Sequence, residues 1–444
     1  MHYRHLFFLS PLLSLAACQS GIPLSKSLPS TAIVRLEVSS KATMPKPGET
    51  VSFGEAALLA LENNPGLQTF NPALRAADGK ILQASLRPNP TLEGRMENIL
   101  GSNGNTRGFD AAESTVAVSQ LIENGGKLEA RRDVQVAEKA VVRSDYQIAR
   151  RELFAEVSKA FAQALAAQEK VALYTQLVQL NESFLPEIDK RIEAGKVTAV
   201  ERVRARTAVT TARLATQQAQ REFLSAALRL AATWGATTPG FSRVSGTLGE
   251  LPSPADQASL EQRLYAHPAY QKQSRIISKS VAENRLAIAN GKSDVTVQGG
   301  LKHFWEGNDE VALVVGVSIP LPFNNWNQGE IASTNAEIEV AQKQRTATMN
   351  ALKAELNASV QMLAATRREA DTIKAELLPD AQEAFDGVQD GYSKGRFGYL
   401  DLIEARRNLT EARVQLLTAN AAYHESAAEI AGLTAPLPGE NASK

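Results

Sequence analysis

The carboxylates best placed to do chemistry in this sequence follow a glycine turn near the C-terminus. Asp401 and Glu404 lie three residues apart, so they share one face of the helix that is predicted to begin after Gly395. Their shared face concentrates negative charge. A solvated acidic helix start, favoured by the helix dipole, is the alternative interpretation.

Patterns for catalysis or metal binding are absent from the sequence. His2 and His5 lie at the N-terminus, and His267, His303 and His424 are scattered without ligand spacing. There is no P-loop and no G-x-S-x-G motif, and the single cysteine excludes an internal disulfide and a thiolate metal site. We therefore expect no catalytic residue, no metal site and no enzymatic activity.

The composition favours long helices and argues against nucleic acid as a partner. Aromatic residues make up only 6% of the chain, and Ala, Gln, Glu and Arg are frequent, as in extended helical proteins. Lysine plus arginine equals aspartate plus glutamate, 48 of each. No net field therefore draws the chain to nucleic acid.

The N-terminus is typical of an exported lipoprotein. Arg4 precedes the apolar run "LFFLSPLLSLAAC", which is too short to span a bilayer and predicts a signal peptide over residues 1–17. The run ends in a sequence that resembles a bacterial lipobox, so we expect Cys18 to be lipidated; cleavage of an ordinary signal near Cys18 or Ser20 is the alternative. Residues 18–50, rich in Ser, Pro and Lys, are predicted to form a tether.

The rest of the chain contains an internal duplication. "EAGKVTAVERVRARTAVTTAR" and "SKGRFGYLDLIEARRNLTEAR" lie 200 positions apart and align at Gly195 and Gly395. Each half contains helices, a strand pair, a long helix, a glycine turn and a return helix. The expected boundaries are a first repeat at 51–236 (strands about 90–121, hairpin about 127–235), a linker at 237–256, a second repeat at 257–434 (strands about 294–320, hairpin about 329–432) and a tail at 435–444.

Each predicted strand pair has one apolar face. In the last strand Val311, Leu313, Val315 and Val317 share a face. Strands of about ten residues with this alternation match a membrane barrel, and a soluble sheet with one solvated face is the alternative. Four strands cannot close a barrel around a lumen, so several chains would have to share one.

Each return helix carries a heptad pattern. In the second, Leu402, Leu409, Leu416, Tyr423 and Ile430 recur every seven residues, with alanine three positions behind most of them. A 3.5-residue period predicts a left-handed coiled coil. Alanine in the seam permits close approach of the two backbones.

The whole plan resembles the TolC-like outer-membrane factor family, and most closely its branch in cobalt–zinc–cadmium efflux pumps. The resemblance is carried by the two glycine turns and by two strand-to-helix passages, "VSIPLPFNNWNQGEIAS" (317–333) and "QLIENGGKLEAR" (120–131). It implies a mainly α fold with a membrane β-barrel: a homotrimer whose 12 strands form the barrel and whose helices form a periplasmic tunnel.

The same resemblance implies a passive outer-membrane conduit, with divalent heavy-metal cations as the expected cargo. Its partners would be a periplasmic adaptor and an inner-membrane RND pump that supplies the energy, and no cofactor is expected apart from the N-terminal lipid. Organic drugs and type I protein secretion are alternative uses of the same fold. An alternative of another class is a structural coiled-coil lipoprotein without membrane strands.

Residue roles follow from the resemblance as well. Tyr392, Asp401 and Glu404 match residues at the periplasmic gate, where threefold symmetry would give rings of six carboxylates that attract cations and oppose anions. Phe397 stands where the best-known family member has a gating arginine, so we do not expect that contact here. The two turns would dock the adaptor: Ala194, Gly195, Lys196 and Val197 in the first, and Lys394, Gly395, Arg396 and Phe397 in the second.

Overall fold

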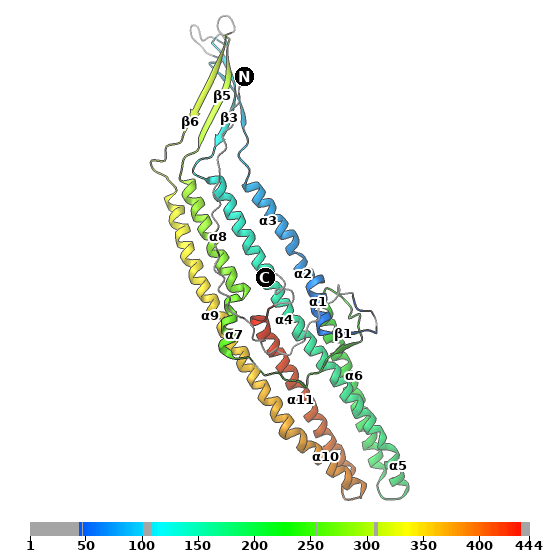
Figure 1. The fold of residues 1–444 in the computed structure, drawn as a ribbon. Coiled ribbons are helices and arrows are strands. Elements are labelled where there is room, and N and C mark those ends of the chain that lie inside the picture. The colour runs from blue at the N-terminus through cyan, green and yellow to red at the C-terminus, as the bar shows by residue number, and fades with distance from the viewer. Residues whose placement is uncertain are drawn as a thin grey trace, which may run out of the picture.

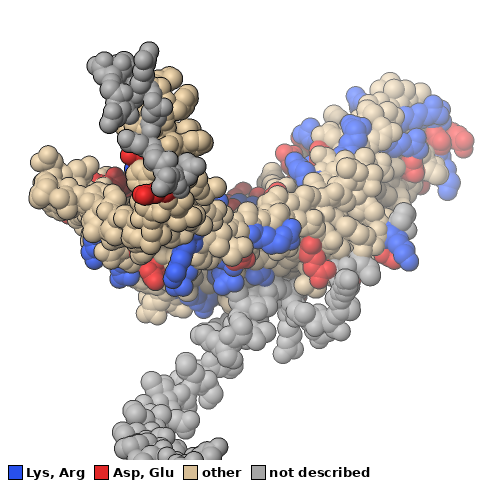
Figure 2. Space-filling model, turned by 90° about the horizontal axis from the view of Figure 1, so that it is seen from above, with Lys and Arg blue, Asp and Glu red and all other residues tan. Residues whose placement is uncertain are grey.

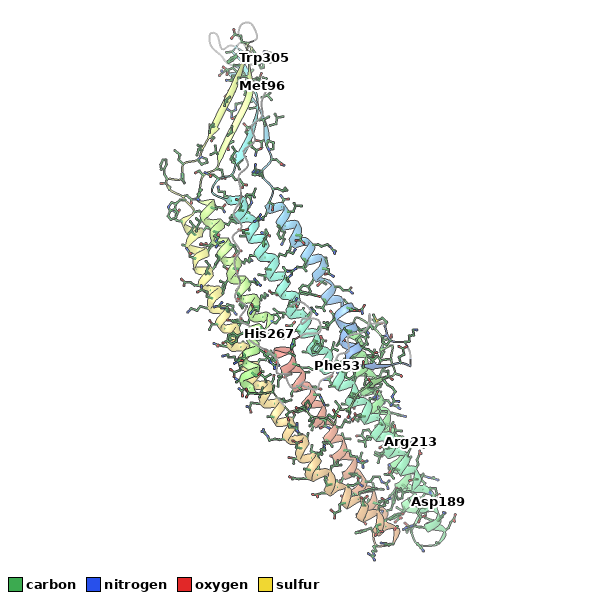
Figure 3. All side chains as sticks on the ribbon, in the orientation of Figure 1. Phe53, Met96, Asp189, Arg213, His267 and Trp305 are labelled. Carbon is green, nitrogen blue, oxygen red and sulfur yellow. The ribbon has the colours of Figure 1, made fainter. Side chains whose placement is uncertain are left out.

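The computed structural model describes residues 44–46, 48–100, 108–109, 111–253, 255–305 and 310–436. The molecule is long and gently curved, with the long strands at one end and the helical hairpins at the other (Figure 1). Met96 and Trp305 mark the strand end, and Asp189 and Arg213 mark the hairpin end (Figure 3). The predicted signal peptide, Cys18 and most of the tether and the tail lie outside the described residues.

The four long strands form one antiparallel sheet in the order β2-β3-β5-β6. The pair β3–β5 joins the two halves of the chain, with Val116 opposite Leu301. The predicted apolar face is present and exposed, while Lys302 on the other face pairs with Glu97 and Glu113. The strand bounds are β2 (Thr91–Glu97), β3 (Glu113–Ile122), β5 (Val295–Phe304) and β6 (Val311–Ser318).

Four helices continue from the strands towards the middle of the molecule. They lie in the order α3, α4, α8 and α9, each in contact with the next. The residue immediately before α4 and the one before α9 both have a left-handed backbone, Gly126 at φ 77° and Asn327 at φ 67°, so the two strand-to-helix passages turn in the same way. The bounds are α3 (Phe70–Ala84), α4 (Lys127–Ser183), α8 (Pro268–Asn290) and α9 (Gln328–Thr372).

The lower half consists of the two predicted hairpins. α4 contacts α6 and α11, and α11 in turn contacts α9 and α10. The predicted heptad seam is buried at Leu402, Leu409, Tyr423 and Ile430 and partly buried at Leu416. The alanines at 205, 212, 219 and 226 in the first copy are buried as well. The bounds are α5 (Leu185–Glu193), α6 (Ala199–Ala232), α10 (Leu378–Ser393) and α11 (Tyr399–Thr434).

Both descending helices are interrupted near a proline. Pro186 follows a break at Phe184 between α4 and α5, whereas Pro379 follows a π-helical turn at Ile373–Leu377 between α9 and α10. Proline lacks the N–H that continues the helical hydrogen bonds, so the helix must adjust in the turn before it. The unequal distances of the two prolines from their glycines therefore place the two interruptions at different distances from the tips.

A small belt at mid-height was not predicted from the sequence. β1 (Thr50–Ser52) and β4 (Arg243–Ser245) form a parallel pair, so the end of the predicted tether and part of the predicted linker are strands. The linker then crosses α11, where Tyr423 Oη donates to the Pro252 carbonyl and His424 Nε2 lies 3.2 Å from the Leu248 carbonyl. The remaining elements are α1 (Phe53–Asn63), α2 (Pro65–Gln68), α7 (Gln257–Arg263) and a 3-10 turn (Leu264–Ala266).

Acidic and basic side chains are interspersed on the surface seen from above (Figure 2). Among the described residues, no helix combines the length and the apolar character that crossing a bilayer requires.

Candidate functional site at the hairpin tips

Both glycine turns have the same hydrogen-bonded geometry. Gly195 N–H donates to the Ile192 carbonyl at 2.9 Å and Lys196 N–H to the Arg191 carbonyl at 2.9 Å. In the second hairpin the donors are Gly395 and Arg396, at 3.0 and 2.8 Å. This pair of bonds is a Schellman motif, which requires a left-handed residue after the helix. The two glycines therefore cap the C-terminal ends of α5 and α10.

The turns require glycine because of its backbone angle, and not because a side chain would clash with its surroundings. Their φ angles are 68° at Gly195 and 76° at Gly395, and a Cβ built on either would meet no atom within 4 Å. A side chain there would be strained by its backbone angle without clashing. The other turn residues are exposed, except Val197, which is half-buried. The tips therefore offer a free surface with the cations Lys196, Lys394 and Arg396.

Phe397 packs back onto its own hairpin. Its ring lies against Gly391, where the space that a Cβ would take is filled by the phenyl carbons. The side chain is still 47% exposed. At the corresponding position of the first hairpin, Arg191 takes the place of Gly391. The second tip thus presents an aromatic face that the first lacks.

Tyr392 lies inside the hairpin end and not on its surface. It is 3% exposed and packs between the two hairpins, with the Arg191 guanidinium carbon 4.2 Å from its ring centroid and the Tyr399 ring 5.9 Å away. Arg191 Nη2 also donates to the Ser393 carbonyl at 3.2 Å. Burial raises the pKa of the Tyr392 phenol, and the nearby Arg191 cation opposes this shift. Tyr392 is therefore a neutral link between the hairpins.

Asp401 and Glu404 are both exposed on the first turns of α11, as their spacing predicts. Asp401 Oδ2 accepts a hydrogen bond of 2.8 Å from Gly398 N–H, so it also caps the helix. No hydrogen bond or ion pair joins Tyr392 to either carboxylate in the described part of the chain. The three predicted gate residues thus lie at one end of the molecule in two layers, an inner tyrosine and an outer acidic pair.

Arg406 is a functional candidate that the sequence did not reveal. Arg406 is 2% exposed and donates through Nη1 to Asn181 Oδ1. Its guanidinium carbon lies 4.4 Å from the Phe184 ring centroid. Burial lowers the pKa of Arg406, while the neighbouring Tyr399 opposes this shift. Its counterpart in the first repeat, Arg206, is exposed. Identical residues at matched positions therefore gave no signal of their different surroundings.

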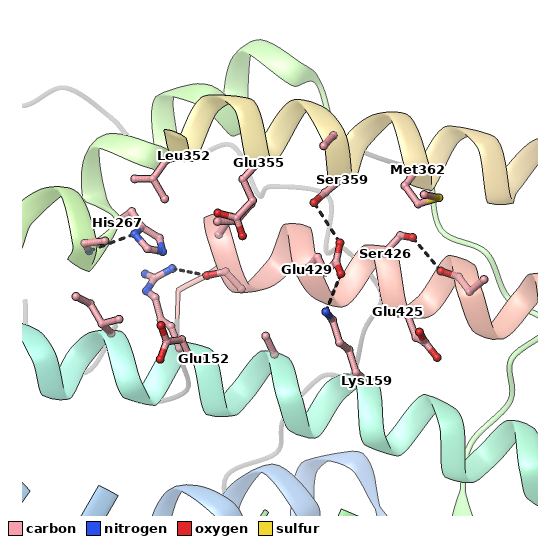
Figure 4. A pocket seen from close by; sticks show the side chains of 18 of the residues that line it. Glu152, Lys159, His267, Leu352, Glu355, Ser359, Met362, Glu425, Ser426 and Glu429 are labelled. Atoms are coloured by element: carbon pink, nitrogen blue, oxygen red, sulfur yellow. Dashed lines mark hydrogen bonds and ion pairs between the residues drawn. The ribbon is translucent and has the colours of Figure 1, made fainter. Parts of the chain in front are cut away.

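A groove of about 780 Å³ opens at mid-height between α4, α9 and α11 (Figure 4). Glu429 accepts hydrogen bonds from Lys159 Nζ at 2.7 Å and Ser359 Oγ at 3.2 Å across it. His267 lines one end, where its Nδ1 accepts from Ala269 N–H at 3.2 Å. Burial and the nearby Arg151 lower the pKa of His267 to about 4, so the ring is neutral.

The histidines that the sequence leaves scattered belong to different elements: His267 precedes α8, His303 lies in β5 and His424 in α11. Among the described residues, no three or more His, Cys, Asp or Glu side chains are grouped so that they could hold a metal ion.

Comparison with known proteins gives matches over both halves of the chain. The family model described as "Outer membrane efflux protein" matches residues 57–236 and 258–435. The cobalt-zinc-cadmium resistance protein CzcC of Cupriavidus metallidurans is 31% identical over 364 residues, which cover 82% of this chain and 85% of that protein.

Solved structures share the fold at low identity. A membrane protein from Pseudomonas aeruginosa superposes with a TM-score of 0.70 at 18% identity, covering 86% of this chain and 90% of that one. The structure of CusC, described in connection with transmembrane channel formation, superposes with a TM-score of 0.69 at 14% identity, covering 90% of this chain and 96% of that one.

Proposed function

The chain belongs to the outer membrane efflux protein family, and from this premise we propose that it is the outer-membrane conduit of a tripartite pump for divalent heavy-metal cations. The observation that carries the cargo is its 31% identity to a cobalt-zinc-cadmium resistance protein over 82% of the chain. The family match extends through both repeats, including the tips and both strand-to-helix passages.

The four-stranded sheet supports a membrane location. Its exposed face carries Leu92, Val116, Leu301 and Leu313, which are 57–75% exposed in the single chain. A strand of ten residues such as β5 is about 33 Å long, enough to cross the apolar layer of a bilayer when tilted. Three copies of the sheet would close a 12-stranded barrel and leave no strand edge unpaired.

Exposed tryptophans at both ends of the sheet fit the same location. Trp305 follows β5 at the loop end and is 52% exposed, and Trp326 lies in the passage from β6 to α9 and is 53% exposed. Tryptophan is enriched where a membrane-spanning surface meets the head groups. The two residues would therefore mark the outer and the periplasmic border of the lipid.

The hairpin end supports the roles of gate and docking surface. Asp401 and Glu404 are exposed, so three copies can bring six carboxylates to the narrow end of the tunnel, where they favour cations. The tip surface combines the cations Lys196, Lys394 and Arg396 with the exposed ring of Phe397, a combination suited to a periplasmic adaptor. A lipid on Cys18 would hold the N-terminus at the membrane.

In this proposal the chain is a passive conduit, and the RND pump in the inner membrane supplies the energy. The selectivity of the conduit for cations would come from the fixed carboxylates at the gate, since a conduit needs binding weak enough for release.

A susceptibility panel tests the cargo. A strain lacking this chain is compared with its complemented parent on zinc, cobalt, cadmium, nickel, copper and hydrophobic drugs. Restored resistance to divalent metals alone supports the proposal. Restored resistance to drugs alone would retain the conduit and overturn the metal cargo, and an unchanged panel would overturn both.

A further inference from the structure

The lower half of the chain has two free lateral edges, and we propose that one edge binds the other edge of a second copy through a ladder of opposite charges. α6 lies at one edge, because its principal partner is α4. α9 and α10 lie at the other edge, in contact with α11 (Figure 1). The inference rests on the proposed trimer, since a closed ring must join these two edges.

The two edges carry opposite charge. α6 contains six arginines and two glutamates, a net charge of +4. α10 contains four carboxylates and no basic residue, a net charge of −4. Complementary fields of this size fix partner and register in protein interfaces.

The charged groups face away from the body of their own chain. On α10, Glu383 and Asp390 are exposed, whereas Phe385 and Tyr392, two residues further along, are buried against the rest of the hairpin end. Two residues span about 200° of an α-helix, so the acids lie on the opposite face. Glu383 is therefore available to a partner beyond α10, whereas Asp390 also pairs with Lys394 of its own chain at 2.6 Å.

α6 shows the same arrangement with an apolar centre. It buries Ala205 and Ala212, and two residues away from each it exposes Val203 (63%) and Leu214 (60%). Arg206 and Arg213 border one side of this apolar stripe and are exposed; Arg213 lies along the lower part of α6 (Figure 3). An apolar stripe bordered by cations is the expected make-up of a helix that packs against an acidic helix.

The two series match in height. Arg206, Arg213 and Arg221 lie 11, 18 and 26 residues after Gly195, and Glu383, Glu376 and Glu369 lie 12, 19 and 26 residues before Gly395. Copies related by rotation about the tunnel axis have their tips at one level. Arg206 and Arg221 of one copy then lie near the height of Glu383 and Glu369 of the next. Arg213, near the height of Glu376, already pairs with Glu182 of its own chain at 2.5 Å, so the ladder rests on the first and third rungs.

The duplication of the chain does not by itself explain this charge pattern. α11, the internal counterpart of α6, contains three arginines and five carboxylates, a net charge of −2. The two return helices therefore diverged in sign while their buried alanines stayed in register. Arg206 and Glu383 also have no ion-pair partner among the residues that the structure describes. The ladder gives both of them one in the next copy.

Cysteine cross-linking in the full-length protein tests the register. The variants Arg206→Cys with Glu383→Cys and Arg221→Cys with Glu369→Cys place thiols at matched heights. The matched controls exchange partners: Arg206→Cys with Glu369→Cys, and Arg221→Cys with Glu383→Cys, which offset the thiols by 15 and 14 residues in height. After mild oxidation, we expect dimer and trimer bands from the first two variants and only monomer from the exchanged and single-cysteine variants.

The other outcomes are separable. If the wild-type chain is trimeric by amine cross-linking but neither double-cysteine variant with matched heights forms a disulfide, the ladder alone is overturned. Equal cross-linking of matched and exchanged pairs would overturn the register. A monomeric wild-type chain would overturn the proposed trimer as well, whereas the metal panel above decides the cargo separately.

Charge reversal gives a second test without cysteine. Arg206→Glu and Glu383→Arg, each alone, put like charges together and should lower the fraction of trimer that survives heating in detergent at least threefold. The two changes combined should restore it. Single variants that match the wild type, or a combined variant that is no better than either, would overturn the ladder.

Discussion

The guanidinium carbon of Arg191, in the first hairpin, lies 4.2 Å from the ring centroid of Tyr392, in the second. The same arginine donates to the Ser393 carbonyl, so one side chain holds both the ring and the backbone of the opposite hairpin. Arg406 makes a second link in the opposite direction, from α11 to Asn181 of α4. The relative position of the two tips therefore depends on two cations.

Arg191→Gln should loosen the tips. A partly desolvated cation–π contact contributes roughly 1–2 kcal/mol, and the variant loses this contact together with the bond to Ser393. We expect single channels in planar bilayers to spend more time in higher-conductance states. Lys190→Gln, on the exposed neighbouring residue, removes one positive charge without touching Tyr392 and should behave as the wild type. Equal behaviour of the two variants would remove Arg191 from the gate.

Gly395→Val should disable efflux while the trimer persists. The φ of 76° strains any β-branched residue by roughly 1–2 kcal/mol, yet the open space around this glycine removes steric clash as a cause. We expect metal resistance to fall and the trimer band to remain. Gly387→Val is the matched control, because this exposed glycine has an ordinary helical backbone in α10. Loss of the trimer in Gly395→Val would contradict the docking role.

Much of the fold could be predicted because periodicity is a local signal. Alternation gave the four long strands, and the heptads through Leu402 and Leu409 gave the buried seam of α11. The mid-height belt escaped prediction for a physical reason: Thr50–Ser52 and Arg243–Ser245 are three residues each. Strands this short acquire their structure from a partner nearly 200 positions away.

At the tips the sequence predicted position better than burial. The turn glycines and the carboxylates at 401 and 404 lie where their spacing placed them. Tyr392 is buried and not exposed at a channel mouth, because an aromatic ring near a turn gives no sign of the hairpin that will cover it. The same limit explains Arg406, whose copy at position 206 remains on the surface.

Removing the charge of the acidic pair should change ion selectivity without unfolding the helix start. Asp401→Asn combined with Glu404→Gln keeps an oxygen that can accept from Gly398 N–H, whereas alanine at 401 would also lose this hydrogen bond. We expect the closed channel to conduct more and to prefer cations less, measured as a shift in reversal potential across a salt gradient. Glu411→Gln, further along α11, is the control, and an unshifted potential in the double variant would exclude these residues from the gate.

His267 should make the middle of the molecule sensitive to acid. Its pKa in the folded chain is about 4, below the ordinary value of 6.5, because burial and Arg151 disfavour the charged ring. The unfolded chain therefore binds the proton first as pH falls. The contribution of His267 to the free energy of unfolding is fully present above pH 6.5 and is lost as the pH falls towards 4. The full loss is about 3 kcal/mol per chain.

His267→Asn can still cap α8 but does not titrate, and it should reduce the fall in Tm between pH 7 and pH 5. His424, whose pKa burial also lowers, should leave part of the slope. His303→Asn is the control, and a slope that is equal in both variants and the wild type would contradict the assignment to His267.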